Sequence, residues 1–343
     1  MIGLQGYGYF SPDTDIPEGL IPARITEIHR ELYTAVCEKA EIRAALKGSF
    51  FHQAEDRSDY PAVGDFVLVR YNSNGNSLIE KVLPRKSKFS RTDYSGHAAK
   101  HVKTILEQVV AANFDYVFIM SSLNQDFNVN RIARYITQAR RSGGIPVVIL
   151  TKADLCADWE GQLTAIQEIA GDIDIVPLSS RTGMGLDQLS RYAQPGKTIV
   201  FLGMSGVGKS SLLNALAGEN IMAVKEIRGD DARGRHATTH RQLVRLPSGA
   251  MVIDTPGMRE LGLWDANEAI GTAFSQVEQV IAQCRFSDCH HQTEPGCAVM
   301  AALREGSLSQ SQWRIYLAQK REDVFVRGKT KPPKRKNARV HNG

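Results

Sequence analysis

The chain has 343 residues, and its 42 lysines and arginines against 37 aspartates and glutamates give a formal net charge of +5. That length is enough for two or three domains with a sizeable core. No apolar run approaches the length of a transmembrane helix, and residues 1–10 lack the basic start and apolar core of a signal peptide. These features exclude a membrane partner and predict a cytoplasmic protein.

The positive charge is concentrated at the C-terminal end. Seven basic residues and no acidic ones lie between Val326 and the last residue, and the rest of the chain holds 35 basic against 37 acidic residues. A basic tail of this kind suits a polyanion such as RNA. The alternative is a solvated, disordered end without a ligand.

Residues 1–84 are predicted to form a small β-barrel, because five strand-like runs are separated by turn signals such as Asn74-Gly75-Asn76. The expected strands are Ile21–Ile28, Leu32–Cys37, Ile42–Leu46, Phe66–Tyr71 and Leu78–Val82. Five strands in this length favour an OB-fold, whose barrel often holds single-stranded nucleic acid on one face. An SH3-like or other small barrel without a ligand is the alternative.

Residues 85–104 are expected to form a basic, partly exposed connector. Six lysines and arginines lie between Pro84 and Lys103. Both a contact with phosphates and a purely solvated segment are consistent with this composition.

Residues 105–265 are predicted to form an α/β domain with a parallel sheet, because strand-like and helix-like runs alternate here. The expected strands are 116–120, 146–150, 173–178, 198–202 and 251–253, and the expected helices are 130–140 and 211–216. The motifs described next follow these strands.

A Gly-rich loop follows the strand at 198–202. The run Gly203-Met204-Ser205-Gly206-Val207-Gly208-Lys209-Ser210 matches the phosphate-binding pattern GxxxxGK[ST], and Ser211 continues into a helix-prone stretch. Backbone N–H groups of such a loop and helix start favour an anion. Lys209 is expected to reach the β- and γ-phosphates as a catalytic charge, and Ser210 to coordinate Mg²⁺. The loop predicts a bound nucleoside triphosphate without specifying its base.

The base is indicated by Thr151-Lys152-Ala153-Asp154, which follows another predicted strand. The carboxylate of Asp154 can accept two hydrogen bonds from guanine, a pair of donors that adenine lacks, and Lys152 would pack its methylene stem along the base. The common guanine motif begins with Asn, so Thr151 puts one supporting hydrogen bond in doubt. Ser179-Ser180, after the strand at 173–178, is similar to the short loop that backs guanine through a main-chain N–H.

Further contacts to Mg²⁺ and the γ-phosphate are expected after the phosphate loop. The polar segment 233–239 lies where a switch is expected, and a threonine hydroxyl there can complete Mg²⁺ coordination. Thr238 and Thr239 both qualify, with Thr239 slightly favoured. Asp254 would hold Mg²⁺ through water, and the N–H of Gly257 would contact the γ-phosphate.

These motifs come in an unusual order, since base recognition precedes the phosphate loop and Asp254 comes last. Most GTPases begin with the phosphate loop. The same sheet can be built by joining the old ends and cutting elsewhere, which is a circular permutation. The segment after Asp254 then leads directly into the C-terminal domain, so we expect that domain to follow the nucleotide state.

Residues 266–343 are predicted to form a mainly helical, metal-binding domain with the basic tail. Cys284, Cys289 and Cys297 lie within fourteen residues, together with His290 and His291. Three thiolates and one imidazole suit a tetrahedral Zn²⁺, and four protein ligands leave no open position. We therefore expect one structural zinc ion rather than disulfides or reactive thiols. An amphipathic helix over 307–320 should follow.

The succession T-K-x-D, GxxxxGKS, GRHxTT and DTPG, with a barrel before it and a Cys/His cluster after it, resembles the RsgA family over nearly the whole chain. That family consists of circularly permuted GTPases that act in late assembly of the bacterial small ribosomal subunit. The resemblance implies an OB barrel, a permuted G domain and a zinc domain, with His291 rather than His290 as the fourth zinc ligand. It also implies that the small subunit and its rRNA bind the protein and stimulate hydrolysis of GTP to GDP. A monomer is the default expectation.

Position 258 carries Met, where many GTPases place the Gln that orients the attacking water. Slow intrinsic turnover is therefore expected. The resemblance assigns the water-orienting role to His236, whose neutral imidazole can accept a hydrogen bond from water. The alternative for His236 is an exposed loop histidine without a role.

Two other functions are consistent with part of these observations. An RNA-binding assembly scaffold would hold GTP or GDP as a structural ligand with negligible turnover, and Met258 favours it. A P-loop kinase or ATPase would give Asp154 no role. Turnover of GTP with and without ribosomal subunits would distinguish the scaffold from a GTPase. Competition between ATP and GTP for binding would distinguish a kinase or ATPase from a GTPase.

Overall fold

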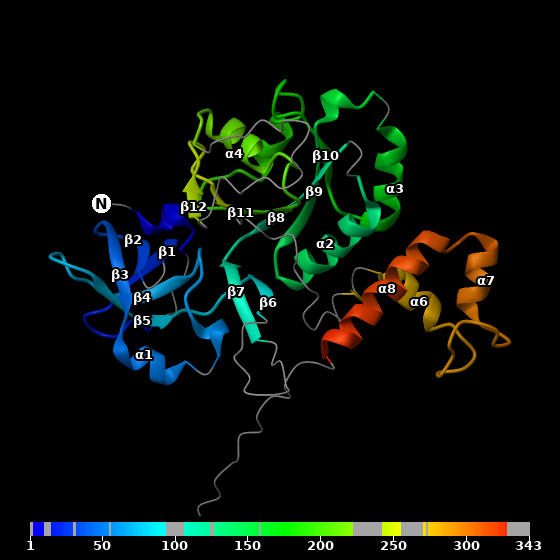
Figure 1. Cartoon of the computed structure of the whole chain (residues 1–343), viewed down its shortest axis with the longest axis horizontal. Coiled ribbons are helices and arrows are strands. Elements are labelled where there is room, and N and C mark those ends of the chain that lie inside the picture. Colours follow the sequence, from blue (N-terminus) through cyan, green and yellow to red (C-terminus); the bar gives the residue numbers. More distant parts are fainter. Residues whose placement is uncertain are drawn as a thin grey trace, which may run out of the picture.

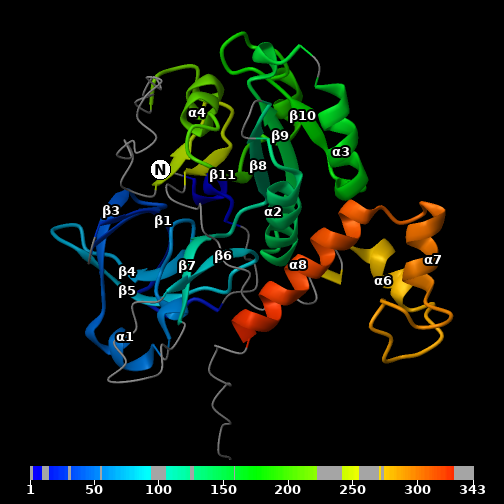
Figure 2. The ribbon, with the colours of Figure 1, turned by 45° about the vertical axis from the view of Figure 1, so that its right-hand side comes forward.

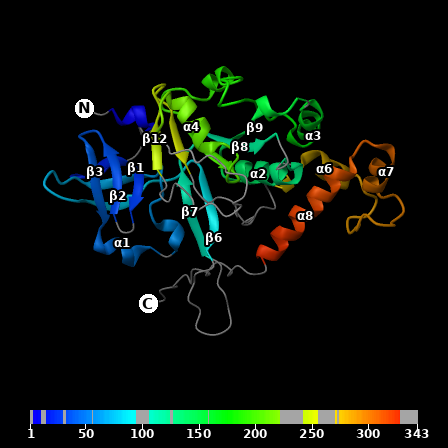
Figure 3. The same cartoon turned by 45° about the horizontal axis from the view of Figure 1, so that its top comes forward.

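The computed structural model describes residues 3–9, 15–29, 32–54, 56–93, 106–123, 127–157, 159–221, 242–254, 270–271 and 274–327. A β-barrel, a central α/β domain and a C-terminal helical domain follow one another across the molecule (Figure 1). The barrel and the C-terminal helices lie at opposite ends of the α/β domain (Figure 3). Within the described ranges, every helix is too short or too polar to cross a membrane.

The N-terminal barrel consists of the five strands that the sequence predicts, each within one residue of the expected bounds. They are β1 (Ile21–His29), β2 (Leu32–Cys37), β3 (Glu41–Leu46), β4 (Phe66–Arg70) and β5 (Ser77–Val82). Their order is β1-β2-β3-β5-β4, and β4 pairs back onto β1, which closes the barrel. The single parallel pairing joins β3 to β5, and α1 (Gly48–Gln53) lies between β3 and β4 in the chain. Alternate residues such as Ala23 and Ile25 fill the interior.

The expected basic connector is in part a strand. β6 (Lys88–Asp93) pairs antiparallel with β7 (Leu106–Ala112), and Phe89 is buried and stacks on Phe114 with ring centroids 5.0 Å apart. The strand pattern is not visible in the sequence because lysines and arginines surround Phe89. One of them, Lys88, lies at the surface and forms an ion pair of 2.8 Å with Glu107. Residues 94–105 lie outside the described ranges.

The central domain is built on a six-stranded sheet of order β10-β9-β8-β11-β13-β12. Five of its strands are parallel, and β12 is antiparallel and lies between β13 and β1 of the barrel. Their bounds are β8 (Tyr116–Ser122), β9 (Ile145–Thr151), β10 (Ile175–Pro177), β11 (Thr198–Gly203), β12 (Gln242–Arg245) and β13 (Met251–Asp254). Both faces are apolar, because helices cover both.

Helices α2 (Val129–Arg141) and α3 (Glu160–Ala170) pack on one face of this sheet, and α4 (Lys209–Ala217) packs on the other (Figure 2). The strand that enters the phosphate loop, β11, lies in the middle of the sheet although three of the parallel strands precede it in the chain. This is the arrangement that the permuted motif order predicts.

The C-terminal domain contains α6 (Ser275–Ile281), α7 (Ala298–Glu305) and α8 (Gln310–Arg327). The helix predicted over 307–320 begins later and continues to residue 327. Ser309 caps it, since the N–H of Gln312 donates to Ser309 Oγ at 3.0 Å. Trp313 and Tyr316 are buried and stack with centroids 5.5 Å apart. Of the seven basic residues of the tail, only the first, Arg327, falls within the described ranges.

Candidate nucleotide-binding site and metal centre

The phosphate loop joins the buried strand β11 to α4 through a turn that needs its glycines. Gly206 and Gly208 have φ of 77° and 102°, which is the left-handed region that glycine tolerates. A Cβ on Gly203 would lie 2.7 Å from the carbonyl oxygen of Met120. The side chain of Val207 is buried and anchors the loop, whereas Ser205 and Gly206 are exposed. The loop therefore presents backbone to solvent, as an anion site requires.

Lys209, the first residue of α4, folds back over this loop. Its Nζ donates to the carbonyl oxygens of Gly203 at 2.8 Å and of Met204 at 2.7 Å. The ammonium group is thereby held at the loop beside the N-terminus of α4, where a helix favours negative charge. Ser210 and Ser211 follow in the first turn and are half-buried.

The predicted base-recognition loop begins where β9 ends. Lys152 has φ 59° and ψ 35°, a left-handed conformation that is uncommon for a residue other than glycine. The N–H of Ala153 donates to the carbonyl of Leu178 at 3.1 Å, which ties this loop to the one after β10. Asp154 is exposed at the surface. In the loop after β10, Ser179 Oγ accepts hydrogen bonds from two backbone N–H groups, those of Arg181 (3.3 Å) and Thr182 (3.2 Å).

Thr151 connects the base-recognition loop to the phosphate loop. Its Oγ1 donates to the carbonyl oxygen of Val207 at 2.6 Å, and Thr151 is only 2% exposed. Thr151 therefore reaches the phosphate loop through a hydroxyl, without the amide that the Asn of the common motif carries. Sequence reasoning did not find this contact, because the two residues are 56 positions apart.

Asp254 lies at the end of β13 and is 4% exposed. Because β13 pairs in parallel with β11, this carboxylate lies at the same edge of the sheet as Gly203. The structure thus brings the carboxyl ends of β9, β10, β11 and β13 to one edge, where open α/β sheets bind ligands. His236, Thr238, Thr239 and Gly257 lie outside the described ranges, and their roles stay predictions.

The C-terminal cluster brings together three cysteines and one histidine. One ligand atom from each of Cys284, Cys289, His291 and Cys297 lies within 4.8 Å of all the others. His291 Nδ1 is 3.5 Å from Cys284 Sγ and 3.6 Å from Cys297 Sγ. Bonds of about 2.3 Å to sulfur and 2.0 Å to nitrogen around one centre would produce separations of this size. The donor set and its spacing therefore fit a tetrahedral zinc ion.

The loop that carries these ligands is held by Glu294, which sequence reasoning missed. Its carboxylate accepts hydrogen bonds from the N–H groups of Gln292 (2.8 Å), His290 (2.9 Å) and Thr293 (3.0 Å). Hydrogen bonds from the backbone, that of Gln292 first, lower the pKa of Glu294 to about 2. His291 has φ 57°, so its backbone needs such support. The sequence signal that could have identified Glu294 is an acidic residue placed between two predicted metal ligands.

Two further contacts orient the ligands. The ring of His291 meets Trp313 of α8 edge-on, with centroids 5.5 Å apart. Cys297 precedes α7, and its Sγ accepts from the N–H of Met300 at 3.4 Å. Burial acts to raise the pKa of the Cys284 thiol, but hydrogen bonds from the N–H groups of Val299 and Ala298 hold it below its usual value. The thiolate is thus favoured at Cys284, whereas burial raises the pKa of the Cys289 thiol to about 11.

Comparisons with known proteins agree with this geometry. A family model described as RsgA GTPase matches residues 82–264. The protein named Small ribosomal subunit biogenesis GTPase RsgA 2 from Lactiplantibacillus plantarum is 41% identical over 324 residues, which cover 94% of this chain and 89% of that protein. A protein of the same name from Listeria monocytogenes is 41% identical over 331 residues, covering 96% and 92%.

Two solved structures are similar over most of the chain. The crystal structure of YjeQ from Thermotoga maritima aligns with a TM-score of 0.65 at 27% identity, covering 89% of this chain and 99% of that one. The structure of YloQ, described as a circularly permuted GTPase, aligns with a TM-score of 0.60 at 23% identity, covering 92% and 98%. The second likeness supports the fold.

Proposed function

The chain belongs to the RsgA family of GTPases and hydrolyses GTP, and from that premise we propose that it binds the small ribosomal subunit and acts in its late assembly. The names of its relatives support this role. The observation that carries the chemistry is the hydrogen bond of 2.6 Å between Thr151 and Val207, because it joins a guanine-type loop to a phosphate loop at one edge of the sheet. We place the protein in the cytoplasm, as a monomer.

The base is proposed to bind between the loops after β9 and β10. Asp154 would accept the N1–H and exocyclic amine of guanine, and the stem of Lys152 would cover the base plane. The left-handed backbone at Lys152 supports this role, since strained conformations cluster at ligand sites. Ser179 shapes the second loop, so that a main-chain N–H at Ser180 can contact the base.

The triphosphate is proposed to bind along residues 203–211. Lys209 would leave the carbonyls of Gly203 and Met204 and move to the β- and γ-phosphate oxygens, which carry full negative charge. Ser210, Asp254 and one of Thr238 and Thr239 would hold Mg²⁺, which when bound neutralises phosphate charge. Positioning and charge neutralisation are the main catalytic terms in phosphoryl transfer.

The water that attacks the γ-phosphate needs a hydrogen-bond acceptor, which the side chain of Met258 cannot supply. We propose His236 for this role, with the N–H of Gly257 contacting the γ-phosphate. Intrinsic turnover should then be slow until the subunit orders these residues. Replacing His236 by Ala should abolish subunit-stimulated hydrolysis while nucleotide binding remains; full stimulated turnover in that variant would contradict the assignment.

The Cys/His cluster is proposed to hold one structural zinc ion. Its ligands would be Cys284, Cys289, His291 and Cys297, and with four protein ligands no position remains for a substrate. Metal analysis of the native protein should find one zinc per chain, and its absence would overturn this assignment. The barrel and the basic tail are proposed to contact rRNA.

The test of the function is GTP turnover by the protein alone, with small subunits and with large subunits. We expect slow turnover alone and a large increase with small subunits only. Equal stimulation by both subunits would contradict the proposed partner. Tight GTP and GDP binding with negligible turnover under all three conditions would favour the assembly scaffold instead.

A further inference from the structure

Building on the proposed function, in which Asp254 holds Mg²⁺ through water, we propose that the barrel keeps this carboxylate in place. Glu27 of β1 and Gln242 of β12 are the positioning residues, and they act through strand pairing rather than through a contact with the nucleotide. The barrel then belongs to the Mg²⁺ side of the nucleotide site, in addition to any contact that it makes with rRNA.

Asp254 lies just beyond the part of β13 that the phosphate-loop strand supports. The parallel pairing of β11 with β13 covers Met251–Ile253 and ends with Val200 beside Ile253. Within the described strands, Gln242, the first residue of β12, is the one residue paired with Asp254. The position of Asp254 at the nucleotide edge of the sheet therefore depends on β12.

β12 in turn is supported by the barrel. It has only four residues, Gln242–Arg245, and it pairs with β13 on one side. On its other side Gln242 pairs with Glu27 of β1. Without β1, β12 would be a four-residue edge strand held from one side. Glu27, Gln242 and Asp254 thus form one row across three strands, and the barrel supplies its outer member.

The row faces the helix that follows the phosphate loop. Residues opposite one another in antiparallel strands point to the same face of a sheet. Leu243 and Ile253, one residue along each strand, belong to the core cluster of α2 and α3. Gln242 and Asp254 therefore lie on the opposite face, which α4 covers. Helix α4 carries Ser210, the other predicted Mg²⁺ ligand from a described segment, in its first turn.

A bulge allows β1 to pass from the barrel to the central sheet. Over Ile21–Arg24, β1 pairs with β4 of the barrel. Its register with β2 shifts between Ile25 and Glu27, and the intervening Thr26 donates from Oγ1 to the carbonyl oxygen of Thr34 at 3.2 Å. Such a bulge bends a strand and increases its twist. Beyond it, β1 pairs with β12 in place of β4.

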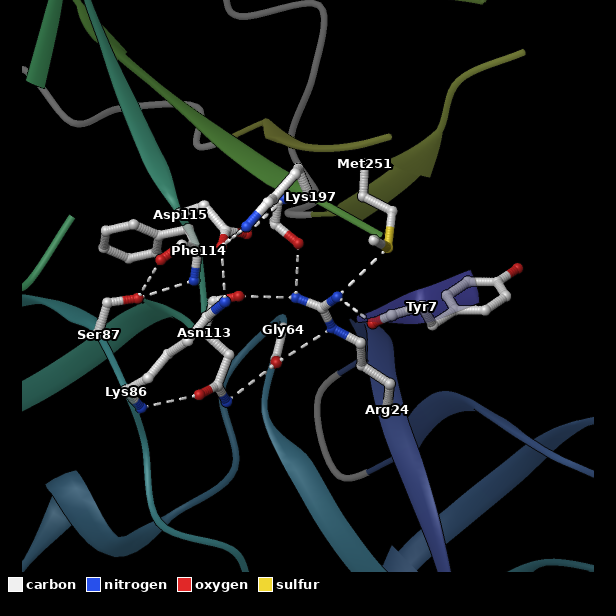
Figure 4. A network of polar contacts seen from close by, with 11 residues as sticks. Tyr7, Arg24, Gly64, Lys86, Ser87, Asn113, Phe114, Asp115, Lys197 and Met251 are labelled. Carbon is white, nitrogen blue, oxygen red and sulfur yellow. Dashed lines mark hydrogen bonds and ion pairs between the residues drawn. The ribbon is translucent and has the colours of Figure 1, made fainter. Parts of the chain in front are cut away.

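Arg24 fixes β1 against the other end of the same central strands (Figure 4). It is 1% exposed. Its Nη2 donates to Thr198 Oγ1 at 3.0 Å, and its Nη1 lies 3.2 Å from Met251 Sδ. Thr198 and Met251 are register partners at the starts of β11 and β13. β1 is therefore attached to the central sheet at both ends of β13, through Arg24 at the start and through Glu27 level with Asp254.

The guanidinium of Arg24 is also held from the barrel side. Its Nε donates to the carbonyl oxygen of Gly64 at 3.3 Å, its Nη1 donates to the carbonyl of Tyr7, and its Cζ lies 4.9 Å from the ring centroid of Phe66. Gly64 has φ 90°, and a Cβ there would clash with the carbonyl oxygen of Ala112. The two backbones thus meet closely beside Arg24, and β1 is a fixed support for the row.

This support should affect Mg²⁺-dependent binding and spare binding without Mg²⁺. A group that holds a metal ion must keep its place to within about 0.5 Å. Residues outside the ligand shell that orient such a group change metal affinity about 10- to 100-fold when they are replaced. The phosphate loop and the base loop do not belong to the row, so nucleotide affinity in the absence of Mg²⁺ should stay native.

Glycine variants along the row test the proposal in the full-length protein. Glycine weakens a strand, because its backbone is more flexible and it has no side chain to pack. Gln242→Gly should raise the Mg²⁺ concentration for half-maximal binding of a fluorescent GTP analogue about 10-fold. Glu27→Gly should raise it less, since Glu27 is one strand further from Asp254. Affinity for the same analogue in EDTA should be native in both variants.

Two matched controls carry the same substitution outside the row. Arg245→Gly lies at the other end of β12, opposite Met251, and Glu41→Gly lies at an exposed position of β3 in the barrel. Both should keep native Mg²⁺ dependence. Gln242→Thr favours a strand and should also be close to native. An equal shift in Arg245→Gly would indicate a general loss of strand stability, and an equal shift in Gln242→Thr would assign the effect to the amide side chain. Either result would overturn the proposal.

Hydrogen exchange without nucleotide and without Mg²⁺ measures the support itself. Gln242→Gly and Glu27→Gly should speed exchange at the end of β13, while β11 keeps its native protection. Native exchange in both variants would overturn the proposal. If the native protein binds nucleotide without any dependence on Mg²⁺, the role of Asp254 in the proposed function is wrong, and hydrogen exchange still decides whether the barrel holds this residue in place.

Discussion

The hydroxyl of Thr151 should determine how tightly the protein holds guanine nucleotides. Replacing Thr151 by Val keeps the branched shape but removes the donor of the 2.6 Å hydrogen bond to Val207. Thr151 and Val207 are 2% and 4% exposed, so water cannot take the place of the lost donor. The carbonyl of Val207 is then buried without this partner, and the phosphate loop loses its tie to β9.

The size of the effect follows from that geometry. Leaving a buried acceptor unsatisfied costs about 1–3 kcal/mol. If this cost lowers the fraction of molecules whose phosphate loop is in the binding-competent conformation, the apparent dissociation constant for the nucleotide rises about 5- to 150-fold. GTP and GDP should be affected equally, because Val207 lies on the part of the loop that both nucleotides would contact. The preference for GTP over ATP should not change, because Asp154 is intact.

Titration of a fluorescent GDP and a fluorescent GTP analogue measures this prediction. Thr151→Ser is the matched control, since it retains the hydroxyl, and it should bind like the native protein. Native affinity in Thr151→Val would refute the reasoning. A lower melting temperature with unchanged affinity would also refute it, because the hydroxyl would then support the fold alone.

Three other predictions follow from the same contacts. Asp154→Asn should bind guanine nucleotides at least about 100-fold more weakly. It should gain affinity for xanthosine triphosphate, whose C2 carbonyl can accept a hydrogen bond from an amide, and competition binding measures both changes. Glu294→Gln should weaken zinc retention about 10- to 100-fold, seen as faster release to a chelator, with the exposed Glu305→Gln unchanged as its control. Cys289→Ser should lower the zinc content and the melting temperature together, and native zinc content in that variant would remove Cys289 from the ligand set.

Local pattern was enough to predict most of the fold. The barrel strands alternate between interior and exterior residues, and the central strands are short apolar runs bounded by glycine or polar turns. The β6–β7 hairpin was missed because Phe89 is the one large apolar residue in a basic stretch. Its burial depends on Phe114, which lies in the turn before β8. Pairing with a distant segment is not visible in a window of ten residues.

The site was predictable where a motif is contiguous and not where two segments meet. The phosphate loop, the base loop and the Cys/His cluster each lie within fifteen residues, so spacing alone predicts them. The Thr151–Val207 hydrogen bond needs the parallel sheet that brings β9 near β11. Glu294 needs the left-handed turn at His291, which directs several N–H groups toward one carboxylate. Such contacts depend on backbone geometry that cannot be read from the sequence.

Arg24 shows why domain arrangement is the hardest part to predict. In β1 the neighbouring residues Ala23 and Ile25 face the barrel interior, so alternation places Arg24 on the outside, where a charged residue is expected in solvent. It is buried because the α/β domain covers that face. In the permuted order the barrel precedes β8, the first strand of the central sheet, and the C-terminal domain follows β13, the last one in the chain. Both ends created by the permutation are therefore joined to a flanking domain.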